Sequence, residues 1–132
     1  MKKTVIVGPC SADSKSLMKN LGNRYNLDFE EFRKFDEATE FLCKTENKPD
    51  LILASRIISG DEAQGLDLLE VIKEKCSDVP VVLLTRFKDV QNRAIEKGAV
   101  AAFDMDLVIG YVTPAKKNKQ KEVFEILDRI LK

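Results

Sequence analysis

Histidine and tryptophan are absent from this chain of 132 residues, and only three cysteines are present. Because histidine is the commonest general base and metal ligand, its absence excludes catalysis by a Ser–His or Cys–His pair. The cysteines, Cys10, Cys43 and Cys76, are odd in number and have no CxxC spacing. They indicate reduced thiols and a cytoplasmic location. We therefore expect no enzyme, no cofactor and no metal site.

Net charge and long apolar runs are also lacking. The 22 Lys and Arg residues balance 22 Asp and Glu residues, so we expect no bulk attraction to nucleic acid or to an anionic membrane. No apolar run approaches the roughly 20 residues that span a bilayer. The hydrophobic content of 44% and charged content of 33% are typical of a globular protein. The length predicts a single domain, residues 1–132.

Short apolar runs alternate with segments of helical periodicity. The runs predict strands at residues 4–7, 27–32, 51–54, 81–84 and 100–103. Ser11 and Asp36 are expected to cap the first two helices and Gly22 to end the first, and Val90, Ala94 and Ile95 indicate a fourth helix. Parallel strands need crossover helices, so this order predicts an α/β fold with a doubly wound, five-stranded parallel sheet.

Four stretches resemble the receiver domains of bacterial response regulators. Pro-Asp-Leu-Ile-Leu at 49–53 resembles the third strand of that family, and Gly-Leu-Asp-Leu-Leu at 65–69 the start of its third helix. Val-Pro-Val-Val-Leu-Leu-Thr at 79–85 resembles the fourth strand, and Gly98-Ala99 the residues before the fifth. The resemblance covers nearly the whole chain. It implies a flavodoxin-like, CheY-like (βα)5 fold and a role in two-component signal transduction, the bacterial phosphorelay.

The resemblance also implies which positions phosphorylation needs. Two acidic residues after the first strand bind Mg²⁺, an Asp after the third accepts the phosphoryl group, a Thr or Ser ends the fourth, and a Lys ends the fifth. The cations neutralise the phosphoryl oxygens. In this chain Gly8, Pro9 and Cys10 follow the first strand and offer no carboxylate to a hard cation.

The other positions are degenerate too, apart from one. Ser55 stands at the acceptor position when residues are counted from Pro49, and Ile57 when they are counted back from Gly65. Met105 replaces the lysine, and only Thr85 is retained. Without Mg²⁺ ligands the pocket is not expected to phosphorylate Ser55. Thr85 is either a relic of the switch or a structural residue.

Arg86 follows Thr85, where the family usually has a small residue. A long cationic side chain there is expected to occupy the space of a phosphoryl group. We expect Arg86 to pair with a carboxylate, for which Asp50, Asp61 and Asp104 are candidates.

The stretch after Asp106 is apolar where the resemblance implies a short turn. It either folds over the degenerate pocket, presents an adhesive surface, or forms a longer fifth strand and extra core. The expected partner face lies beside the fourth helix, fifth strand and last helix, and comprises Ala102, Phe103, Leu107, Val108, Ile109, Tyr111 and Val112.

Lysine-rich residues 116–121 precede the last helix in this interpretation. Cations are unfavourable at a helix N-terminus, so the helix is expected to begin after them, at about 122–131. The run is then a solvated loop or a docking patch for an acidic partner.

The sequence thus predicts a pseudo-receiver that signals by protein–protein interaction, with a signalling protein or a second copy as its partner. Two alternatives stay open. The first is a module that binds a small ligand in the crevice at the strand ends. The second is an atypical receiver that is phosphorylated on another acidic residue, such as Asp61 or Asp104.

Overall fold

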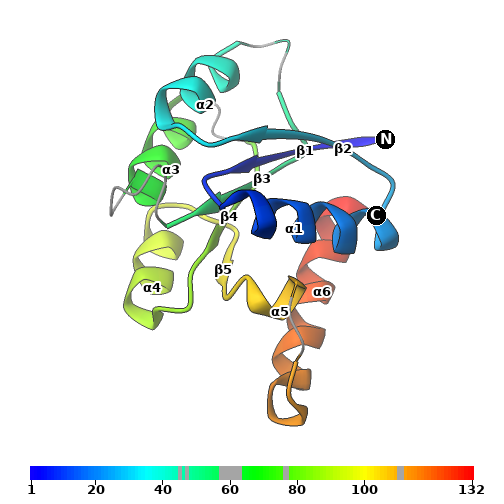
Figure 1. The fold of residues 1–132 in the computed structure, drawn as a ribbon. Coiled ribbons are helices and arrows are strands. Elements are labelled where there is room, and N and C mark those ends of the chain that lie inside the picture. Colours follow the sequence, from blue (N-terminus) through cyan, green and yellow to red (C-terminus); the bar gives the residue numbers. More distant parts are fainter. Residues whose placement is uncertain (45, 47, 57–63, 76–77, 110–111) are drawn as a thin grey trace.

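The computed structural model describes residues 1–44, 46, 48–56, 64–75, 78–109 and 112–132. Five strands form one parallel sheet in the order β2-β1-β3-β4-β5 (Figure 1). The strands are β1 (Lys2–Val7), β2 (Leu27–Phe32), β3 (Leu51–Ser55), β4 (Val81–Leu84) and β5 (Ala101–Phe103). The predicted parallel sheet is confirmed.

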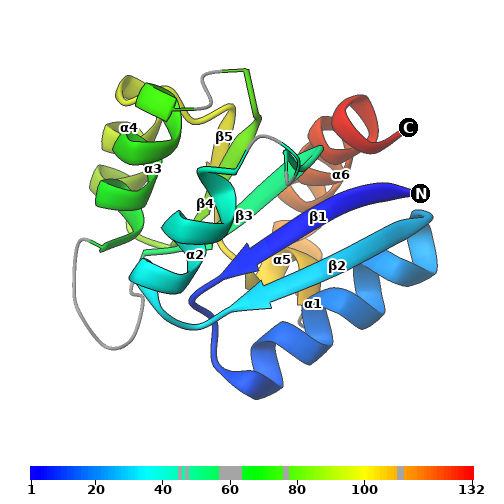
Figure 2. The same ribbon diagram turned by 90° about the horizontal axis from the view of Figure 1, so that it is seen from above.

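Helices cover both faces of the sheet (Figure 2). One face packs against α2 (Phe35–Leu42), α3 (Gln64–Lys75) and α4 (Lys88–Glu96). The other packs against α1 (Ser11–Arg24), the short α5 (Asp106–Ile109) and α6 (Lys117–Leu131). None of the helices among the described residues is long and apolar enough to cross a membrane.

The alternation of side chains along the central strands divides the core into two clusters. Val5 and Val7 of β1 face the cluster under α2, α3 and α4, whereas Ile6 faces the cluster under α1, α5 and α6. All three side chains are fully buried. Strands that are buried on both faces account for the continuous apolar runs in the sequence.

Several predicted helix ends are wrong. Cys10, not Ser11, is the N-cap of α1, and Lys34, not Asp36, is that of α2; neither side chain makes a capping hydrogen bond. Phe35 extends α2 backwards because its ring packs on the core. Helix α1 continues past Gly22 to Arg24.

The predicted fourth helix is α4, and it buries two of the three apolar residues that indicate it. Val90 and Ala94 form the buried side of α4, and Ile95 is 49% exposed. Adjacent helical positions are about 100° apart, so Ile95 turns away from the sheet when Ala94 faces it.

The lysine run belongs to the last helix, contrary to the prediction. A 3-10 turn over Pro114–Lys116 leads directly into α6, which begins at Lys117. Proline at the first position of the turn is preset for a helical φ. Lysine, glutamine and glutamate are good helix formers, and Val123, Leu127 and Leu131 bury one side of α6. These contributions outweigh the unfavourable interaction between the lysines and the helix dipole.

The apolar insertion forms additional core. Leu107 and Val108 of α5 are buried, and α5 packs against α1 and α6. The Gln120 side-chain amide donates a hydrogen bond to the Leu107 carbonyl over 3.0 Å. Of the three alternatives, this arrangement supports extra core; residues 110–111 lie outside the described part of the chain.

Candidate functional site

The carboxyl ends of the strands meet at one edge of the sheet, where the sequence places the degenerate positions. Val7 pairs with Ala54, and Leu84 pairs with both Ser55 and Phe103. Hydrogen bonding between neighbouring chain segments continues beyond the ends of β3 and β4. The Arg56 N–H donates to the Leu84 carbonyl, and the Thr85 N–H donates to the Phe103 carbonyl. The residues that follow the strands are thereby brought to the same edge.

The end of β1 does not fit a divalent cation. Gly8 has a φ of 101°, a conformation that residues with a side chain rarely adopt. Pro9 is buried, and Cys10 is exposed at the start of α1. Mg²⁺ binds oxygen ligands, above all carboxylates, and the side chains of this segment provide no carboxylate.

The end of β3 is closed by the start of α3. The Gly65 N–H donates to the Arg56 carbonyl over 3.0 Å. A Cβ atom on Gly65 would lie 2.2 Å from the Ser55 carbonyl oxygen, so only glycine fits here. Ser55 itself is half-buried. Ile57 and Asp61 lie outside the described residues.

Thr85 at the end of β4 holds the following loop. Its side chain is almost fully buried, at 7% exposure. Its hydroxyl accepts a hydrogen bond from the Phe87 N–H over 3.2 Å, and its carbonyl accepts one from the Gln91 amide over 2.7 Å. These contacts favour a structural role for the retained threonine, because both fix the connection from β4 to α4.

Arg86 is exposed and stacks on an aromatic ring. Its guanidinium carbon lies 5.4 Å from the centre of the Phe87 ring, and that of Arg56 lies 4.9 Å from the same centre. Within the described residues, Arg86 takes part in none of the ion pairs.

The expected pairing of Arg86 is therefore wrong for the two described candidates. Asp50 lies at the opposite edge of the sheet, where its carboxylate accepts the Lys3 N–H over 2.8 Å. The Asp104 carboxylate accepts the Asp106 N–H over 3.0 Å. Asp61 is outside the described part of the chain.

Met105 stands where the resemblance implies a lysine, and its surroundings are apolar. The side chain is half-buried and packs on the cluster under α1, α5 and α6. It lies between β5 and α5 and supplies no cation to the strand edge.

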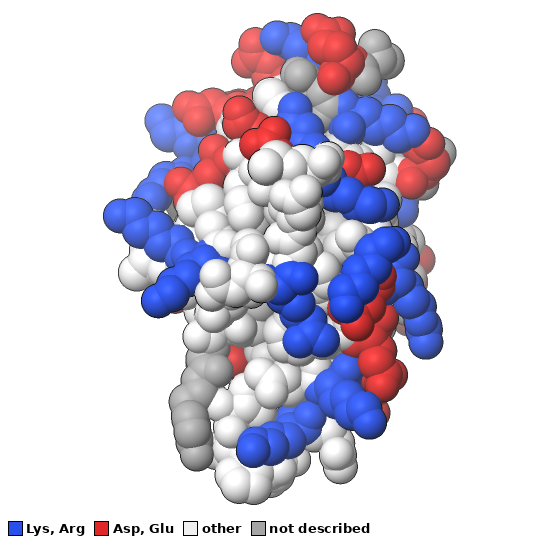
Figure 3. All heavy atoms as spheres, turned by 90° about the vertical axis from the view of Figure 1, so that its right-hand side faces the viewer, with Lys and Arg blue, Asp and Glu red and all other residues white. Residues whose placement is uncertain are grey.

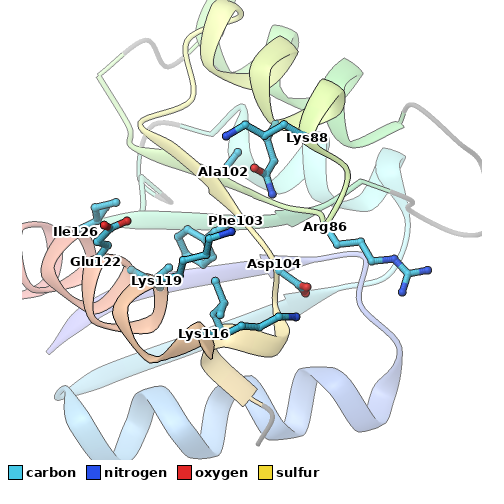
Figure 4. Close-up of a pocket in the computed structure, with 12 residues that line it drawn as sticks. Arg86, Lys88, Ala102, Phe103, Asp104, Lys116, Lys119, Glu122 and Ile126 are labelled. Carbon is cyan, nitrogen blue, oxygen red and sulfur yellow. The ribbon is translucent and has the colours of Figure 1, made fainter. Parts of the chain in front are cut away.

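A groove of about 510 Å³ runs between α4 and α6 over the edge strand β5 (Figure 4). Lys88 and Lys119 lie on opposite walls, with Ala102 and Phe103 between them. Ala102 is half-buried. The lining residues are Arg86, Lys88, Gln91, Ala102, Phe103, Asp104, Leu107, Lys116, Lys119, Glu122, Val123 and Ile126.

All the described residues of the expected partner face are buried or half-buried. Phe103 and Leu107 are only 6% and 7% exposed, so they contribute to its floor rather than to a protruding surface. Val108 is buried and does not line the groove. Ile109 and Val112 are half-buried and lie outside it, and Tyr111 is not among the described residues.

Sequence reasoning singled out Arg86 and the lysine run at 116–121, but it missed the groove that Arg86, Lys116 and Lys119 line. Lys88 and Gln91 are three residues apart on α4, and Lys119, Glu122 and Ile126 are three and four apart on α6. This spacing places each set on one helix face. The pattern was visible in the sequence, but not the fact that both faces flank β5.

Charged groups at the amino ends of the strands are paired. The Tyr25 hydroxyl donates to Asp128 over 2.6 Å, and Arg24 and Lys132 each lie 3.7 Å from that carboxylate. Burial and the Asp128 hydrogen bond raise the pKa of Tyr25 to about 12. The Tyr25 hydrogen bond in turn lowers the pKa of Asp128.

Known proteins match this chain in structure but not in sequence. No protein-family model matches it, and no curated protein matches it. Among solved structures, the response-regulator domain of CheB from Thermotoga maritima is similar, with 18% identity, a TM-score of 0.71, and coverage of 98% of this chain and 96% of that one. The receiver domain of HemR from Leptospira biflexa has 21% identity and a TM-score of 0.69, with 98% and 94% covered.

The Mn²⁺-bound response regulator Rcp1 is also similar, with 21% identity, a TM-score of 0.67, and coverage of 96% and 91%. The chain therefore has the fold of response-regulator receiver domains, a class of signalling domain. The fold predicted from the sequence is confirmed.

Proposed function

We propose that this chain is a receiver-fold signalling domain that binds a protein partner and does not accept a phosphoryl group. The observation that carries the proposal is the composition of the strand edge. Gly8, Pro9 and Cys10 follow β1, Ser55 ends β3, and Met105 follows β5. None of these residues supplies a carboxylate for a cation or an ammonium group for a phosphoryl oxygen.

Phosphoryl transfer gathers negative oxygens, and its catalysis rests almost entirely on positioning and electrostatic stabilisation. This edge has the strand geometry of a receiver without those groups. Thr85 has its hydroxyl engaged by the Phe87 N–H. The chain is thus proposed to be non-enzymatic, with its β4–α4 connection held in one conformation.

The groove between α4 and α6 supports a binding role. It joins half-buried apolar side chains, such as Ala102 and Ile126, to charged side chains on both walls. Protein interfaces commonly combine an apolar centre with a polar rim. The groove is the docking surface in this proposal.

The first experiment tests phosphorylation. The protein is incubated with acetyl phosphate and Mg²⁺, and its intact mass is measured; an active receiver domain serves as the positive control. We expect no gain of mass in the wild type or in Ser55→Asp, because the latter still lacks cation ligands. A gain of one phosphoryl group by the wild type would refute the proposal.

The second experiment tests docking. A photo-crosslinking amino acid is placed at Ile126 in the groove and, as a matched control, at exposed Glu40 on α2. Irradiation in cells of the native host is expected to give a discrete protein adduct at position 126 that is absent at position 40. Identical products at both positions, or none at 126, would contradict docking in the groove.

A further inference from the structure

We infer that an extended, basic segment of another protein adds as a sixth strand to the free edge of the sheet at β2. This edge is the one opposite the groove, so the site goes beyond the proposed function and does not depend on it. Outward-facing main-chain groups, half-buried apolar side chains and unpaired carboxylates occur together on this strand.

The outer edge of β2 carries main-chain donors and acceptors that face away from the sheet. The Lys2 N–H donates to the Asn26 carbonyl over 3.2 Å, and the Gly8 N–H donates to the Phe32 carbonyl over 2.9 Å. In the parallel register of β1 and β2, these bonds direct the main-chain groups of residues 28, 30 and 32 toward β1. The N–H and C=O groups of residues 27, 29 and 31 therefore point outward.

No second strand covers this edge in the described part of the chain. Strand β2 is the outermost strand on its side of the sheet, and only β1 pairs with it (Figure 2). It has six residues, whereas β5 at the other edge has three and lies under the groove between α4 and α6. Extended peptides bind other proteins by adding a strand to such an edge, where main-chain hydrogen bonds provide affinity.

Apolar side chains lie on both faces of β2 beside this edge. Leu27 and Phe29 are half-buried against the core cluster under α1, and Phe32 is half-buried against the cluster under α2. The Phe32 ring lies 4.9 Å from the Phe41 ring of α2. An added strand would cover the area of Leu27 and Phe29 that is still exposed, and such cross-strand contacts stabilise sheets.

The charge on β2 is negative and mostly unpaired. Asp28, Glu30 and Glu31 are exposed, and within the described residues neither Asp28 nor Glu30 takes part in an ion pair. Glu31 lies 3.9 Å from Arg33. Residues 26–42, which include β2 and α2, contain six acidic and two basic residues, although the whole chain has zero net charge.

The surface view shows the same separation of charge. Most Asp and Glu side chains of Figure 3 lie in its upper half, at the level of α2 and β2 in Figure 1. Lys and Arg side chains predominate in the lower half. A basic segment is therefore attracted to the β2 side of the molecule.

The two faces of β2 define the pattern of the segment that fits. Side chains alternate between faces along a strand, so Asp28 and Glu30 lie on the α2 side when Leu27 and Phe29 lie on the α1 side. A strand that alternates basic and apolar side chains places its cations beside the carboxylates and its apolar groups beside Leu27 and Phe29.

The same carboxylates argue against a second copy of this chain at the edge. Charged side chains on edge strands commonly prevent two copies of a protein from pairing edge to edge. Two β2 strands side by side would bring Asp28, Glu30 and Glu31 of both chains together. Like charges opposite each other on neighbouring strands are destabilising, so a segment of opposite charge fits better.

Three synthetic peptides of about eight residues, long enough to cover a strand of ordinary length, test the inference with the full chain. The first alternates valine with lysine, and the second has glutamate in place of lysine. The third repeats the first with methyl groups on its backbone nitrogens, which keeps the charge and removes the main-chain donors. Fluorescence of the labelled peptides measures binding, and hydrogen exchange followed by NMR measures the protection of each β2 amide.

We expect the valine–lysine peptide to bind at least about tenfold more tightly than the other two, and more weakly as salt rises from about 50 to 200 mM. It should slow hydrogen exchange at the amides of residues 27, 29 and 31 by about tenfold or more. The amides of residues 28, 30 and 32 should change little, because they already donate to β1.

Two matched pairs of variants locate the site. Glu31→Pro removes an outward N–H, which an edge strand tolerates, and Glu31→Ala removes the same charge but keeps the N–H. The proline variant should bind the peptide about fivefold more weakly than the alanine variant. Asp28→Asn/Glu30→Gln should weaken binding about tenfold. Glu96→Gln/Glu125→Gln, at exposed positions of α4 and α6, should change it less than about twofold.

Each other result overturns the inference. Equal binding of the glutamate peptide would show that charge does not select the segment. Equal binding of the methylated peptide, or no added protection at residues 27, 29 and 31, would show that no strand is added. Protection of these amides in the protein alone, lost on dilution, would identify a second copy as the occupant. If the valine–lysine peptide does not bind, β2 is only a protected edge. If Glu31→Pro does not fold, Asp28→Asn/Glu30→Gln decides.

Discussion

The two ends of the sheet differ in how their charges are used. At the amino ends, Tyr25 and Asp128 are joined by a hydrogen bond, and Lys48 pairs with Asp78. At the carboxyl ends, Arg56 and Arg86 share the ring of Phe87, and within the described residues neither forms an ion pair. Paired charges hold elements of the fold together, whereas cations without an anionic partner stay available to bind one.

The largest expected effect comes from the carboxyl end of β3. Gly65→Ala should lower the free energy of unfolding by about 3 kcal/mol or more, because the new Cβ overlaps the Ser55 carbonyl oxygen. Chemical denaturation measures the change. The matched control is Gly22→Ala in α1, where the nearest atom is 3.8 Å away. That variant should be more stable by about 0.5–1 kcal/mol, and an equal loss in both would contradict the close approach at Gly65.

The insertion after β5 is expected to give the next largest effect. Leu107→Ala should cost about 2–4 kcal/mol of stability, because a buried leucine leaves a cavity. Val112→Ala, at a half-buried position of the same segment, should cost less than about 1 kcal/mol. Thermal and urea unfolding test the pair. Equal small losses would mean that α5 is not part of the core.

At the amino end, Tyr25→Phe removes the hydroxyl that donates to Asp128. The expected loss of stability at pH 7 is about 1 kcal/mol, because Tyr25 is buried but solvent reaches the Asp128 carboxylate and screens the pair. The Tyr25 pKa is raised from 10.0 to about 12 in the folded protein. The stabilisation is therefore complete below pH 10 and disappears between pH 10 and 12. Wild type and variant should converge over that range; a constant difference would exclude the hydroxyl as the cause.

The smallest effect is expected at Arg86. Arg86→Ala should change stability by less than about 1 kcal/mol, because the side chain is exposed and contacts only the Phe87 ring among the described interactions. Differential scanning calorimetry against wild type measures this. A loss as large as that of Leu107→Ala would indicate that Arg86 forms an ion pair in the crevice.

Sequence patterns predicted the architecture because its causes are local. Residues 51–54 of β3 and Val81–Leu84 of β4 are apolar throughout, as expected of strands covered on both faces. Helix ends were less predictable, since Phe35 joins α2 through a tertiary contact with the core. The lysines of α6 show the same limit: an electrostatic preference of the isolated helix was overridden by burial at Val123 and Leu127.

The candidate site was predictable in its chemistry but not in its shape. The lack of carboxylates after β1 can be read directly from Gly8, Pro9 and Cys10. The burial of Leu107 and Val108 could not be predicted from the sequence, because it depends on where α1 and α6 lie. The groove depends on the separation of α4 and α6 across β5, which no local pattern encodes.

The backbone at Gly8 has an evolutionary consequence. Its φ of 101° suits glycine, and a side chain there is strained by about 1–2 kcal/mol. An aspartate introduced at this position would therefore weaken the domain before any other acidic group was present to make it useful. A metal site at this end of β1 would therefore need a change in the course of the main chain together with new acidic side chains, and a single substitution would not create it.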